Sequence, residues 1–393
     1  MKYYFTVFYL YFLSFFGSTA GLTAQTSNFY QLSENTVISL ITCTPGNQVY
    51  NIFGHSAIRI FEPETNRNEV YNYGTFDFDQ PNFIWKFITR TVQYKLSKVS
   101  FKYFMKELQA EHRGVSEQIL KLNQQQRQKL FEYLETNYLP QNREYLYDFF
   151  YDNCATRIRD VMNKGIAEVK IKDVPSKKRF RDFLDEYLQH DPWLNFGIYL
   201  ILGLEADKIC TYNFQMFLPD YLSSNLGKST MNNAPLLEEA EWLLPKPEPN
   251  KYKGGFFTPI VFTFSLLSLG LGIIFGLHKK IVLVNIWEIS FYTVMGLVGV
   301  FLLFMWFGTD HIATQKNLNI LWANPLYLIW IFIGFRKKIT KFALYMGYLL
   351  FVSNIIAILI FVFPLQQFNF AVLPIILLMI VQLGNRLFIK KLN

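Results

Sequence analysis

The chain has 393 residues, of which 51% are hydrophobic, 18% are aromatic and only 17% are charged. This composition excludes an ordinary soluble protein, and the length allows about two or three domains. The net charge of +8 arises in part from Lys and Arg in short loops between apolar stretches, so it does not require a nucleic-acid partner.

Residues 1–24 predict a secretory signal peptide. A single Lys precedes an apolar run from Tyr3 to Phe16, and small residues follow up to Ala24. This order of a basic start, an apolar middle and a small-residue cleavage region is typical of exported proteins, although an uncleaved anchor helix would show a similar run. In either case we expect the next segment to be exported.

Residues 25–244 predict one exported domain of the α+β class, in which strands come first and helices follow. The early runs are apolar and β-branched, and the second and third can pair as a hairpin. Later segments repeat apolar residues at helical spacing. The expected strands are 36–43, 49–64, 68–78 and 115–122, and the expected helices are 124–139, 154–165, 178–189 and 193–204.

The Pro-rich segment 245–256 predicts a linker, and residues 257–393 predict an all-α transmembrane domain of five helices. Most of the apolar stretches reach the ~20 residues that cross a bilayer. Basic residues cluster after the first, third and fifth stretches, so we expect the C-terminus in the cytoplasm and the preceding domain outside. The expected spans are 257–277, 281–307, 320–335, 342–363 and 370–389.

Cys154 is the main candidate for a nucleophile among the three cysteines of the chain. Asn153 before it is a good N-cap residue, so we expect Cys154 in the first turn of a helix that ends near Gly165. The helix dipole and the unpaired amides of that turn would favour the thiolate and could bind an oxyanion. A disulfide is the alternative in an exported compartment, and Cys43 and Cys210 could form one.

His55 lies in an apolar strand and is the candidate base. A buried imidazole needs a partner, so a structural hydrogen bond or a catalytic role explains it, and thiol catalysis requires an imidazole to take and return the proton. Asn72 and Asp77, in the next strand run, are candidates for the group that orients the ring. Cys43 and Asn153 are further residues that could line the site.

Other polar residues are candidates for lipid or substrate contacts. Asp310 and His311 follow the second span on the outer side, where they could contact a lipid headgroup or a substrate or simply cap helices. Arg59 and Arg157 are further candidates of this kind. Glu288 lies within the second span, where an ionisable group usually has a partner. Because no zinc, nucleotide-binding or serine-hydrolase motif is present in the sequence, we expect neither a metal nor a cofactor.

The order of a strand-borne His55 and a later helix-borne Cys154 resembles the circularly permuted papain-like thiol folds, which include the NlpC/P60-type hydrolases and the lecithin:retinol acyltransferase-like enzymes. A closer resemblance is to the Lnb-type lipoprotein N-acyltransferase family of Bacteroidota. It is carried by the blocks ISLITCTPGNQVYNIFGHSAIRI, YNYGTFDF, YDNCATRIRD, MFLPDYL and DHIATQKNLNILWANPL. That resemblance implies a periplasmic permuted papain-like domain, with Cys154 as the acyl-accepting nucleophile and His55 as its base.

The same resemblance implies the partners and the location of the protein. The acyl donor would be a phospholipid, and the acceptor would be the α-amine of a diacylated lipoprotein. The protein would lie in the bacterial inner membrane with its catalytic domain in the periplasm. A thiol suits this reaction because a thioester is stable enough to wait and reactive enough towards an amine.

Two other functions fit parts of the sequence. The Cys/His pair could belong to a membrane-anchored periplasmic cysteine amidase or peptidase that acts on cell-wall peptide, although five spans exceed what an anchor needs. A non-enzymatic envelope module would make Cys154 purely structural.

Overall fold

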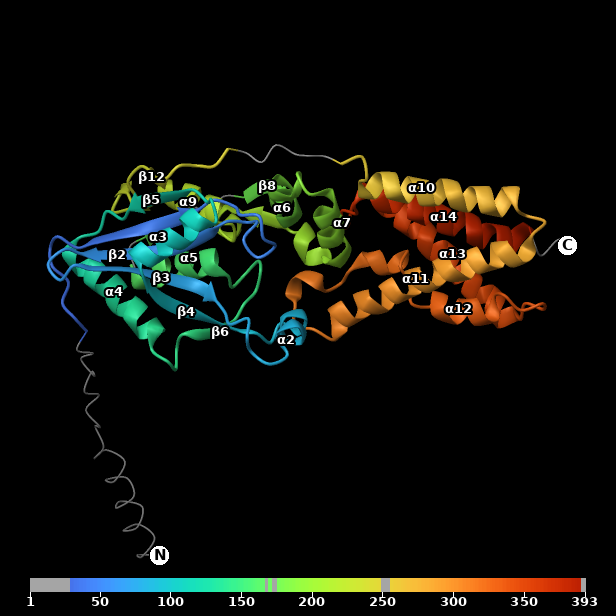
Figure 1. Ribbon diagram of the computed structural model, residues 1–393, viewed down its shortest axis with the longest axis horizontal. Coiled ribbons are helices and arrows are strands. Elements are labelled where there is room, and N and C mark those ends of the chain that lie inside the picture. The colour runs from blue at the N-terminus through green and yellow to red at the C-terminus, as the bar shows by residue number, and fades with distance from the viewer. Residues whose placement is uncertain (1–28, 167–168, 172–174, 249–254, 390–393) are drawn as a thin grey trace, which may run out of the picture. The chain divides into compact units, whose positions relative to one another are not determined.

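The computed structural model describes residues 29–166, 169–171, 175–248 and 255–389 (Figure 1). The predicted signal peptide and residues 249–254 of the predicted linker lie outside these ranges. Leu32 and the described residues after it form one compact unit, to which all the contacts given below belong.

An antiparallel sheet forms the centre of the N-terminal half. Among the described residues it has seven strands in the order β12-β5-β1-β2-β3-β4-β6 (Figure 1). β1 and β2 are buried along most of their length, because apolar residues occupy both of their faces. β2 and β3 form the predicted hairpin. The strands are β1 (Val37–Cys43), β2 (His55–Glu62), β3 (Arg67–Thr75), β4 (Gln93–Ser100), β5 (Val115–Ile119), β6 (Glu144–Leu146) and β12 (Glu241–Leu244).

The four predicted helices of this half are present with small shifts at their ends, and further short elements accompany them. Two small sheets, β7-β10-β11 and β8-β9, lie outside the main sheet. The helices are α2 (Phe83–Thr89), α3 (Phe101–Ala110), α4 (Gln124–Tyr138), α5 (Cys154–Gly165), α6 (Phe180–Leu188), α7 (Pro192–Ile201), α8 (Tyr212–Gln215) and α9 (Pro219–Gly227). The small strands are β7 (Val169–Lys170), β8 (Pro175–Arg179), β9 (Ile209–Thr211), β10 (Thr230–Met231) and β11 (Ala234–Pro235).

Helices cover both faces of the main sheet. On one face, Phe104 and Leu108 of α3 pack in a cluster with Val70 of β3. The neighbouring Tyr71 points the other way, and its hydroxyl donates a hydrogen bond to Glu135 of α4. Because successive residues of a strand point to opposite faces, the sheet lies between α3 and α4, and α5 packs beside α4 against β2 and β3.

The segment before β2 is a loop where the sequence predicts a strand. The expected strand 49–64 begins only at His55, because the preceding residues turn back through a hydrogen bond of 3.0 Å from the Gly54 N–H to the Asn51 carbonyl oxygen. Gly54 has a φ of +81°, and a Cβ atom there would lie 2.8 Å from the carbonyl oxygen of Cys43. Glycine therefore allows the chain to approach β1 closely just before His55.

Four helical stretches among the described residues are long and apolar enough to cross a membrane. They correspond to the first, second, fourth and fifth predicted spans and cover Pro259–Gly276, Ile281–Phe307, Lys341–Val362 and Phe370–Phe388. α14 packs against α10 and α13 (Figure 1). The helices of this half are α10 (Pro259–Leu271), α11 (Ile281–Phe307), α12 (Tyr327–Ile333), α13 (Lys341–Val362) and α14 (Leu373–Gly384).

The predicted third span, 320–335, is not a continuous helix, so four of the five predicted spans are long apolar helices among the described residues. Its region contains a 3-10 turn that ends at Leu321 and then α12, which at seven residues is about 10 Å long. Polar contacts hold the start of the segment in this irregular form: the Leu318 N–H donates to Gln366 Oε1 at 2.8 Å, and Asn319 Nδ2 donates to the Leu200 carbonyl oxygen at 3.1 Å.

Glu288 has the partner that its place in a predicted span led us to expect. Its Oε2 accepts a hydrogen bond of 3.0 Å from Arg386 Nε, and both side chains are buried. The guanidinium of Arg386 lies 3.5 Å from the ring centre of Phe335 and also donates to the carbonyl oxygen of Gly334. The pair therefore ties α11, the end of α12 and the last helical segment together.

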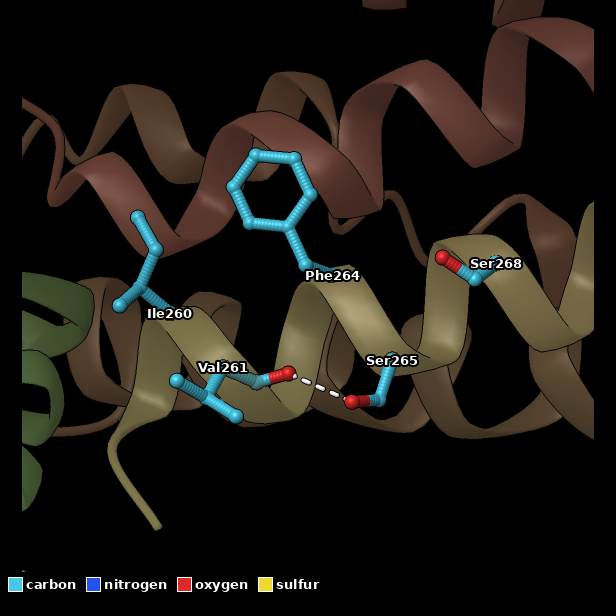
Figure 2. A pocket seen from close by; sticks show the side chains of 5 residues that line it. All are labelled: Ile260, Val261, Phe264, Ser265 and Ser268. Carbon is cyan, nitrogen blue, oxygen red and sulfur yellow. Dashed lines mark hydrogen bonds between the residues drawn. The ribbon is translucent and has the colours of Figure 1, made fainter. Parts of the chain in front are cut away.

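α10 presents an apolar surface with a shallow hollow of about 550 Å³ (Figure 2). Ile260, Phe264 and Ser268 line it from successive turns. The hydroxyl of Ser265 is turned back to the carbonyl oxygen of Val261 at 2.8 Å, which removes a polar group from the surface. This is the surface expected of a helix that faces lipid.

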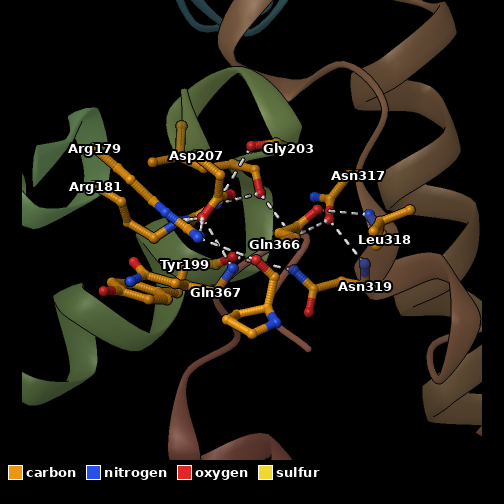
Figure 3. Close-up of polar contacts among 12 residues, drawn as sticks. Arg179, Arg181, Tyr199, Gly203, Asp207, Asn317, Leu318, Asn319, Gln366 and Gln367 are labelled. Atoms are coloured by element: carbon orange, nitrogen blue, oxygen red, sulfur yellow. Dashed lines mark hydrogen bonds and ion pairs between the residues drawn. The ribbon is translucent and has the colours of Figure 1, made fainter. Parts of the chain in front are cut away.

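A buried polar network joins the two halves (Figure 3). The fully buried Arg181 of α6 donates to Asp207 Oδ2 at 3.0 Å and to the Leu202 carbonyl oxygen at 3.1 Å. From the C-terminal half, the Gln367 N–H donates to Asp207 Oδ1 at 2.9 Å, and Gln366 Nε2 donates to the Leu202 carbonyl oxygen at 3.2 Å. Asp207 thus accepts hydrogen bonds from both halves of the protein.

Replacing Asp207 with alanine is expected to lower the free energy of unfolding by about 3–5 kcal/mol, because Arg181 would keep a buried charge without its partner. Denaturant unfolding of the full-length protein in detergent measures this loss. The control is Asp160→Ala, which breaks the Arg159–Asp160 pair at a carboxylate that is 41% exposed and should cost at most about 1 kcal/mol. Equal losses in the two variants would contradict the role given to Asp207.

Candidate active site

Cys154 is the first residue of α5, as predicted, and Asn153 is its N-cap. The side-chain oxygen of Asn153 accepts hydrogen bonds of 2.9 Å from the N–H groups of Ala155 and Thr156. Its NH2 group donates to the carbonyl oxygen of Phe217 at 2.8 Å. Asn153 therefore anchors the start of the helix and holds Cys154 in place.

This cap changes one expectation about the first turn of α5. We expected unpaired amides there to bind an oxyanion, but Asn153 occupies those of Ala155 and Thr156. The N–H of Cys154 itself is the first-turn amide that the Asn153 side chain does not take. An oxyanion at this site would therefore need a further donor.

His55 and Asn72 form a hydrogen-bonded pair at the ends of β2 and β3. His55 Nε2 lies 2.6 Å from Asn72 Oδ1. With the amide oxygen facing the ring, Nε2 carries the hydrogen and donates it, so Nδ1 holds the lone pair that can accept a proton. On its other side, His55 is paired in register with Cys43 of β1.

Local backbone features bring the thiol to the same end of these strands. The backbone N–H of Ser56, the residue after His55, lowers the pKa of the Cys154 thiol and so lies close to its sulfur. Gly74 lies beside Cys154, because a Cβ atom on Gly74 would be 3.6 Å from the Cys154 Cβ. Gly74 has a φ of +90° within a bulge that shifts the β3–β4 register between Asn72 and Thr75. Cys154 therefore lies close to the ends of β2 and β3, where His55 and Asn72 are located.

Burial dominates the electrostatics of both candidate catalytic groups. It raises the pKa of the Cys154 thiol, although the amides of Ser56, Ala155 and Cys154 and then the charge of Arg113 oppose this shift. Burial also lowers the pKa of His55 to about 4, with Arg113 adding to the shift and the hydrogen bond to Asn72 opposing it. At neutral pH the resting pair is therefore a neutral thiol and a neutral imidazole, and the imidazole is free to accept a proton.

Arg113 is a residue of the site that no pattern in the sequence indicates. It is buried, and its Nε donates to the carbonyl oxygen of Thr44 at 2.8 Å while Nη1 pairs with Glu111 at 3.1 Å. Its positive charge acts on Cys154 and His55 together. No motif marks this arginine, because it reaches the site through the loop between α3 and β5.

Tyr145 is a second such residue. Its side chain is 7% exposed, and its hydroxyl has no hydrogen-bond partner among the described residues. That hydroxyl lies 4.0 Å from the position of a Cβ atom on Gly74, next to Cys154. Burial keeps the pKa of Tyr145 well above its usual range, so the hydroxyl stays protonated and can donate.

The structure does not bring Asp77 to His55. β3 ends at Thr75, so Asp77 falls in an exposed turn, where its Oδ1 accepts a hydrogen bond of 2.9 Å from the Asp79 N–H. The partner of the imidazole is Asn72.

The two arginines proposed as substrate contacts are engaged by protein groups. Arg59 donates to Glu117 at 2.9 Å and stacks on Phe101, with 3.9 Å to its ring centre. Arg157 is paired with Asp152, and its guanidinium lies 3.9 Å from the ring centre of Tyr145. Arg157 therefore supports Tyr145, and Arg59 packs on the α3 face of the sheet.

Asp310 and His311 contact the N-terminal half close to α2. The carbonyl oxygen of Asp310 accepts a hydrogen bond of 2.9 Å from Arg90 Nη1, and His311 Nε2 lies 3.2 Å from the carbonyl oxygen of Phe87. These contacts hold the loop after α11 against α2.

All three cysteines are free thiols in the structure, so the alternative disulfide between Cys43 and Cys210 is not formed. Burial raises the pKa of Cys43 to about 12, which makes it a poor nucleophile. No cluster of three or more His, Cys, Asp or Glu side chains that could hold a metal occurs in the part of the chain that the structure describes.

Replacing Arg113 with glutamine is expected to raise the pKa of both Cys154 and His55, because its positive charge lowers each of them. The thiolate fraction at a given pH would fall by about threefold to tenfold. The pH dependence of Cys154 alkylation by iodoacetamide, followed by mass spectrometry, measures the shift. Arg113→Lys keeps the charge and should stay closer to wild type; a glutamine profile that coincides with wild type would contradict the assignment.

Two family models match the chain. The model of the Lnb N-terminal periplasmic domain matches residues 23–185, which include His55, Asn72 and Cys154, and the model of the Lnb transmembrane domain matches residues 251–392. No curated protein and no solved structure matches the sequence. The two models follow each other in order and together cover well over half of the chain. The chain therefore belongs to the Lnb family, and it is a membrane protein with a periplasmic domain.

Proposed function

We propose that this protein is a lipoprotein N-acyltransferase that moves an acyl chain from a phospholipid to a lipoprotein through a thioester on Cys154. Membership of the Lnb family suggests an enzyme of lipoprotein processing. The observation that carries the chemistry is the free thiol at the start of α5, beside the strand ends that hold the His55–Asn72 pair. Both substrates are amphiphiles, and a domain held against a membrane domain meets them at high local concentration.

In the first half-reaction, Nδ1 of His55 takes the proton from the Cys154 thiol while the sulfur attacks the ester carbonyl of the phospholipid. The tetrahedral intermediate collapses with cleavage of the bond to the glycerol oxygen. The imidazolium returns its proton to that oxygen, and a lysophospholipid leaves. The products are an acyl thioester on Cys154 and a neutral His55.

In the second half-reaction, the α-amine of a diacylglyceryl-cysteine attacks the thioester carbonyl. A C–N bond forms, the C–S bond breaks, and the proton released by the amine passes through His55 to the departing thiolate. The products are an N-acylated lipoprotein and a regenerated Cys154 thiol, so both half-reactions balance without a cofactor.

The developing oxyanion would be stabilised by the Cys154 N–H and the Tyr145 hydroxyl. Asn153 uses the other first-turn amides, whereas the Tyr145 hydroxyl is buried, unpaired among the described residues and protonated. A donor held rigidly in a buried site costs little reorganisation when charge develops. The stack of Arg157 on the Tyr145 ring holds this donor in place.

Tyr145→Phe is expected to lower kcat by about 10²–10³-fold with little change in KM, because a single oxyanion donor is lost while the ring remains. Steady-state transfer of acyl chains to a synthetic diacylated lipopeptide measures both constants. Tyr73→Phe, which removes a hydroxyl from the neighbouring ring 6.4 Å away, serves as the control and should match wild type. Tyr145→Phe with an unchanged kcat would exclude the hydroxyl as a donor.

The membrane arrangement of this proposal keeps the predicted topology, with the catalytic domain in the periplasm and the four spanning helices in the inner membrane. The irregular segment from Asn317 to Gly334 would form a fifth crossing. Its start bonds to Leu200 of the periplasmic domain at 2.8 Å, and its end bonds to Arg386, beside Glu288. Residues 25–244, 245–256 and 257–393 remain the proposed periplasmic domain, linker and membrane domain.

The decisive assay for the function is acyl transfer by the full-length protein in phospholipid vesicles. With a diacylated lipopeptide that has a free α-amine, we expect a product heavier by one acyl chain, and an N-acetylated lipopeptide should give none. The alternative function, a cysteine amidase or peptidase, predicts instead that cell-wall peptide fragments are cleaved and the lipopeptide is unchanged. That second pattern would overturn the proposal.

A further inference from the structure

α2 is a short helix whose apolar side chains face outward. None of its residues is buried, and Ile84, Trp85 and Phe87 are 73%, 57% and 51% exposed. Neighbouring loops add Tyr50 and Phe78, which are also exposed. We call these five side chains the α2 surface. A contiguous apolar surface of this kind is costly in water and indicates a partner.

The α2 surface is continuous with a membrane-spanning helix. The Trp85 ring lies 5.7 Å from the ring of Phe304 in the last turn of α11, and α2 lies beside that end of α11 (Figure 1). Arg90, which caps α2, donates to the carbonyl oxygen of Asp310 just after α11. The α2 surface is therefore at the level where α11 leaves the bilayer, which is where Trp and Tyr side chains concentrate in membrane proteins. Among the partners an apolar surface could have, this position selects the outer leaflet of the membrane.

A row of aromatic rings leads from the α2 surface to the candidate nucleophile. Phe87 lies 6.0 Å from Phe83, Phe83 lies 5.7 Å from Phe76, Phe76 lies 4.9 Å from Tyr94, and Tyr94 lies 6.3 Å from Tyr145. We call these five residues the aromatic row. Its exposure falls along the way, from the exposed Phe87 to the buried Tyr94 and Tyr145. The row is thus exposed to solvent at the membrane end and buried next to Cys154.

Arg90 also ties the segment before Cys154 to the membrane end of the row. Its Nε donates to the carbonyl oxygen of Tyr147 at 2.6 Å, and its Nη2 pairs with Asp148 at 3.4 Å. The same guanidinium holds the loop after α11 through Asp310. One side chain therefore sets the position of the nucleophile segment relative to the outer end of α11.

We infer that the α2 surface lies in the outer leaflet and that the aromatic row receives a single long acyl chain of a phospholipid and leads its ester carbonyl to Cys154. The inference rests on the proposed function and adds the route of the donor. All five side chains of the aromatic row are aromatic and none is charged. The row would therefore contact the hydrocarbon chain of a phospholipid and not its charged headgroup. Long acyl chains would therefore be favoured over short ones.

The test uses the full-length protein in vesicles of phosphatidylethanolamine with a minor share of phosphatidylglycerol. Two rates are measured by the acyl mass on Cys154: acylation by the vesicle phospholipid, and acylation by the water-soluble ester p-nitrophenyl butyrate. In Trp85→Glu the ratio of the first rate to the second should fall about tenfold or more, because a charged group replaces an apolar anchor. Trp242→Glu is the matched control: it changes a 50% exposed Trp on β12 and should keep the wild-type ratio.

Phe76→Ala tests the aromatic row in the same way. It should reduce the preference for the long-chain donor over p-nitrophenyl butyrate about tenfold, since it removes the middle ring of the row. A wild-type ratio in Trp85→Glu or Phe76→Ala, or an equal fall in Trp242→Glu, would overturn the inference. If wild type itself is acylated by neither donor, the proposed function fails and the inference fails with it, so the two failures are distinguishable.

Discussion

Cells whose only copy of this protein carries Cys154→Ala are expected to lose N-acylation of their lipoproteins. The Cys154 sulfur forms the thioester bond to the acyl chain, so without it no group can hold the acyl chain for the second half-reaction. Removal of a nucleophile from an enzyme of this type lowers kcat on the order of 10⁶-fold, which brings the rate to background. Mass spectrometry of lipoprotein N-termini measures the result, as a shift from three acyl chains to two.

Cys210→Ala is the matched control for this experiment. Cys210 is, like Cys154, a buried free thiol, but it packs in a cluster with Phe150 and Phe217 and has no part in the proposed reaction. This variant should keep N-acylation even if it loses some stability. Lipoproteins that remain fully N-acylated in Cys154→Ala cells would rule out the proposed role of the thiol.

His55→Ala is expected to slow acyl-enzyme formation by about 10²–10⁴-fold, the usual contribution of a general base. The pH dependence of the wild-type enzyme follows from the lowered pKa of His55. Because that pKa is about 4, below the ordinary value for histidine, the imidazole is neutral and active at pH 7, and the rate falls only as the pH drops through about 4. Rapid-quench measurements of Cys154 acylation across this range test the assignment.

The residue that orients His55 provides the comparison for this prediction. Asn72→Ala removes the hydrogen bond that raises the pKa of His55, so the acid limb should move to lower pH and the maximal rate should fall. Asp77→Ala changes the other residue that the sequence offered, and its exposed position predicts a wild-type profile. A loss of activity in Asp77→Ala with a normal Asn72→Ala would reverse the assignment of the two residues.

The sequence located the strands and helices that carry the site because their patterns are local. The helix start at Cys154 follows from a single cap residue, and the β2–β3 hairpin follows from two apolar runs around a polar turn. The sequence could not show whether Asn72 or Asp77 contacts His55, because this depends on the register shift between Asn72 and Thr75 and on the end of β3 at Thr75. The alternation of apolar and polar residues in a strand does not show where its pairing with the next strand shifts register.

Tyr145 and Arg113 could not be found from the sequence for a different reason. The chain contains 24 tyrosines, and no spacing distinguishes the one whose buried hydroxyl lies beside Gly74 and Cys154. Arg113 reaches the site because its backbone enters β5 beside β1, a contact between distant segments. The interrupted third span was hidden as well, since an apolar stretch has the same composition whether it forms one helix or a 3-10 turn and a short helix.

The most direct test of the account is the intact mass of the full-length wild-type protein after incubation with phospholipid vesicles and no lipoprotein. We expect an added mass of one acyl chain that maps to Cys154, is released by neutral hydroxylamine, and disappears on addition of a diacylated lipopeptide with a free α-amine. The same incubation with Cys154→Ser should give no hydroxylamine-labile adduct. A wild-type protein that transfers acyl chains to the lipopeptide without ever carrying one on Cys154 would contradict the account.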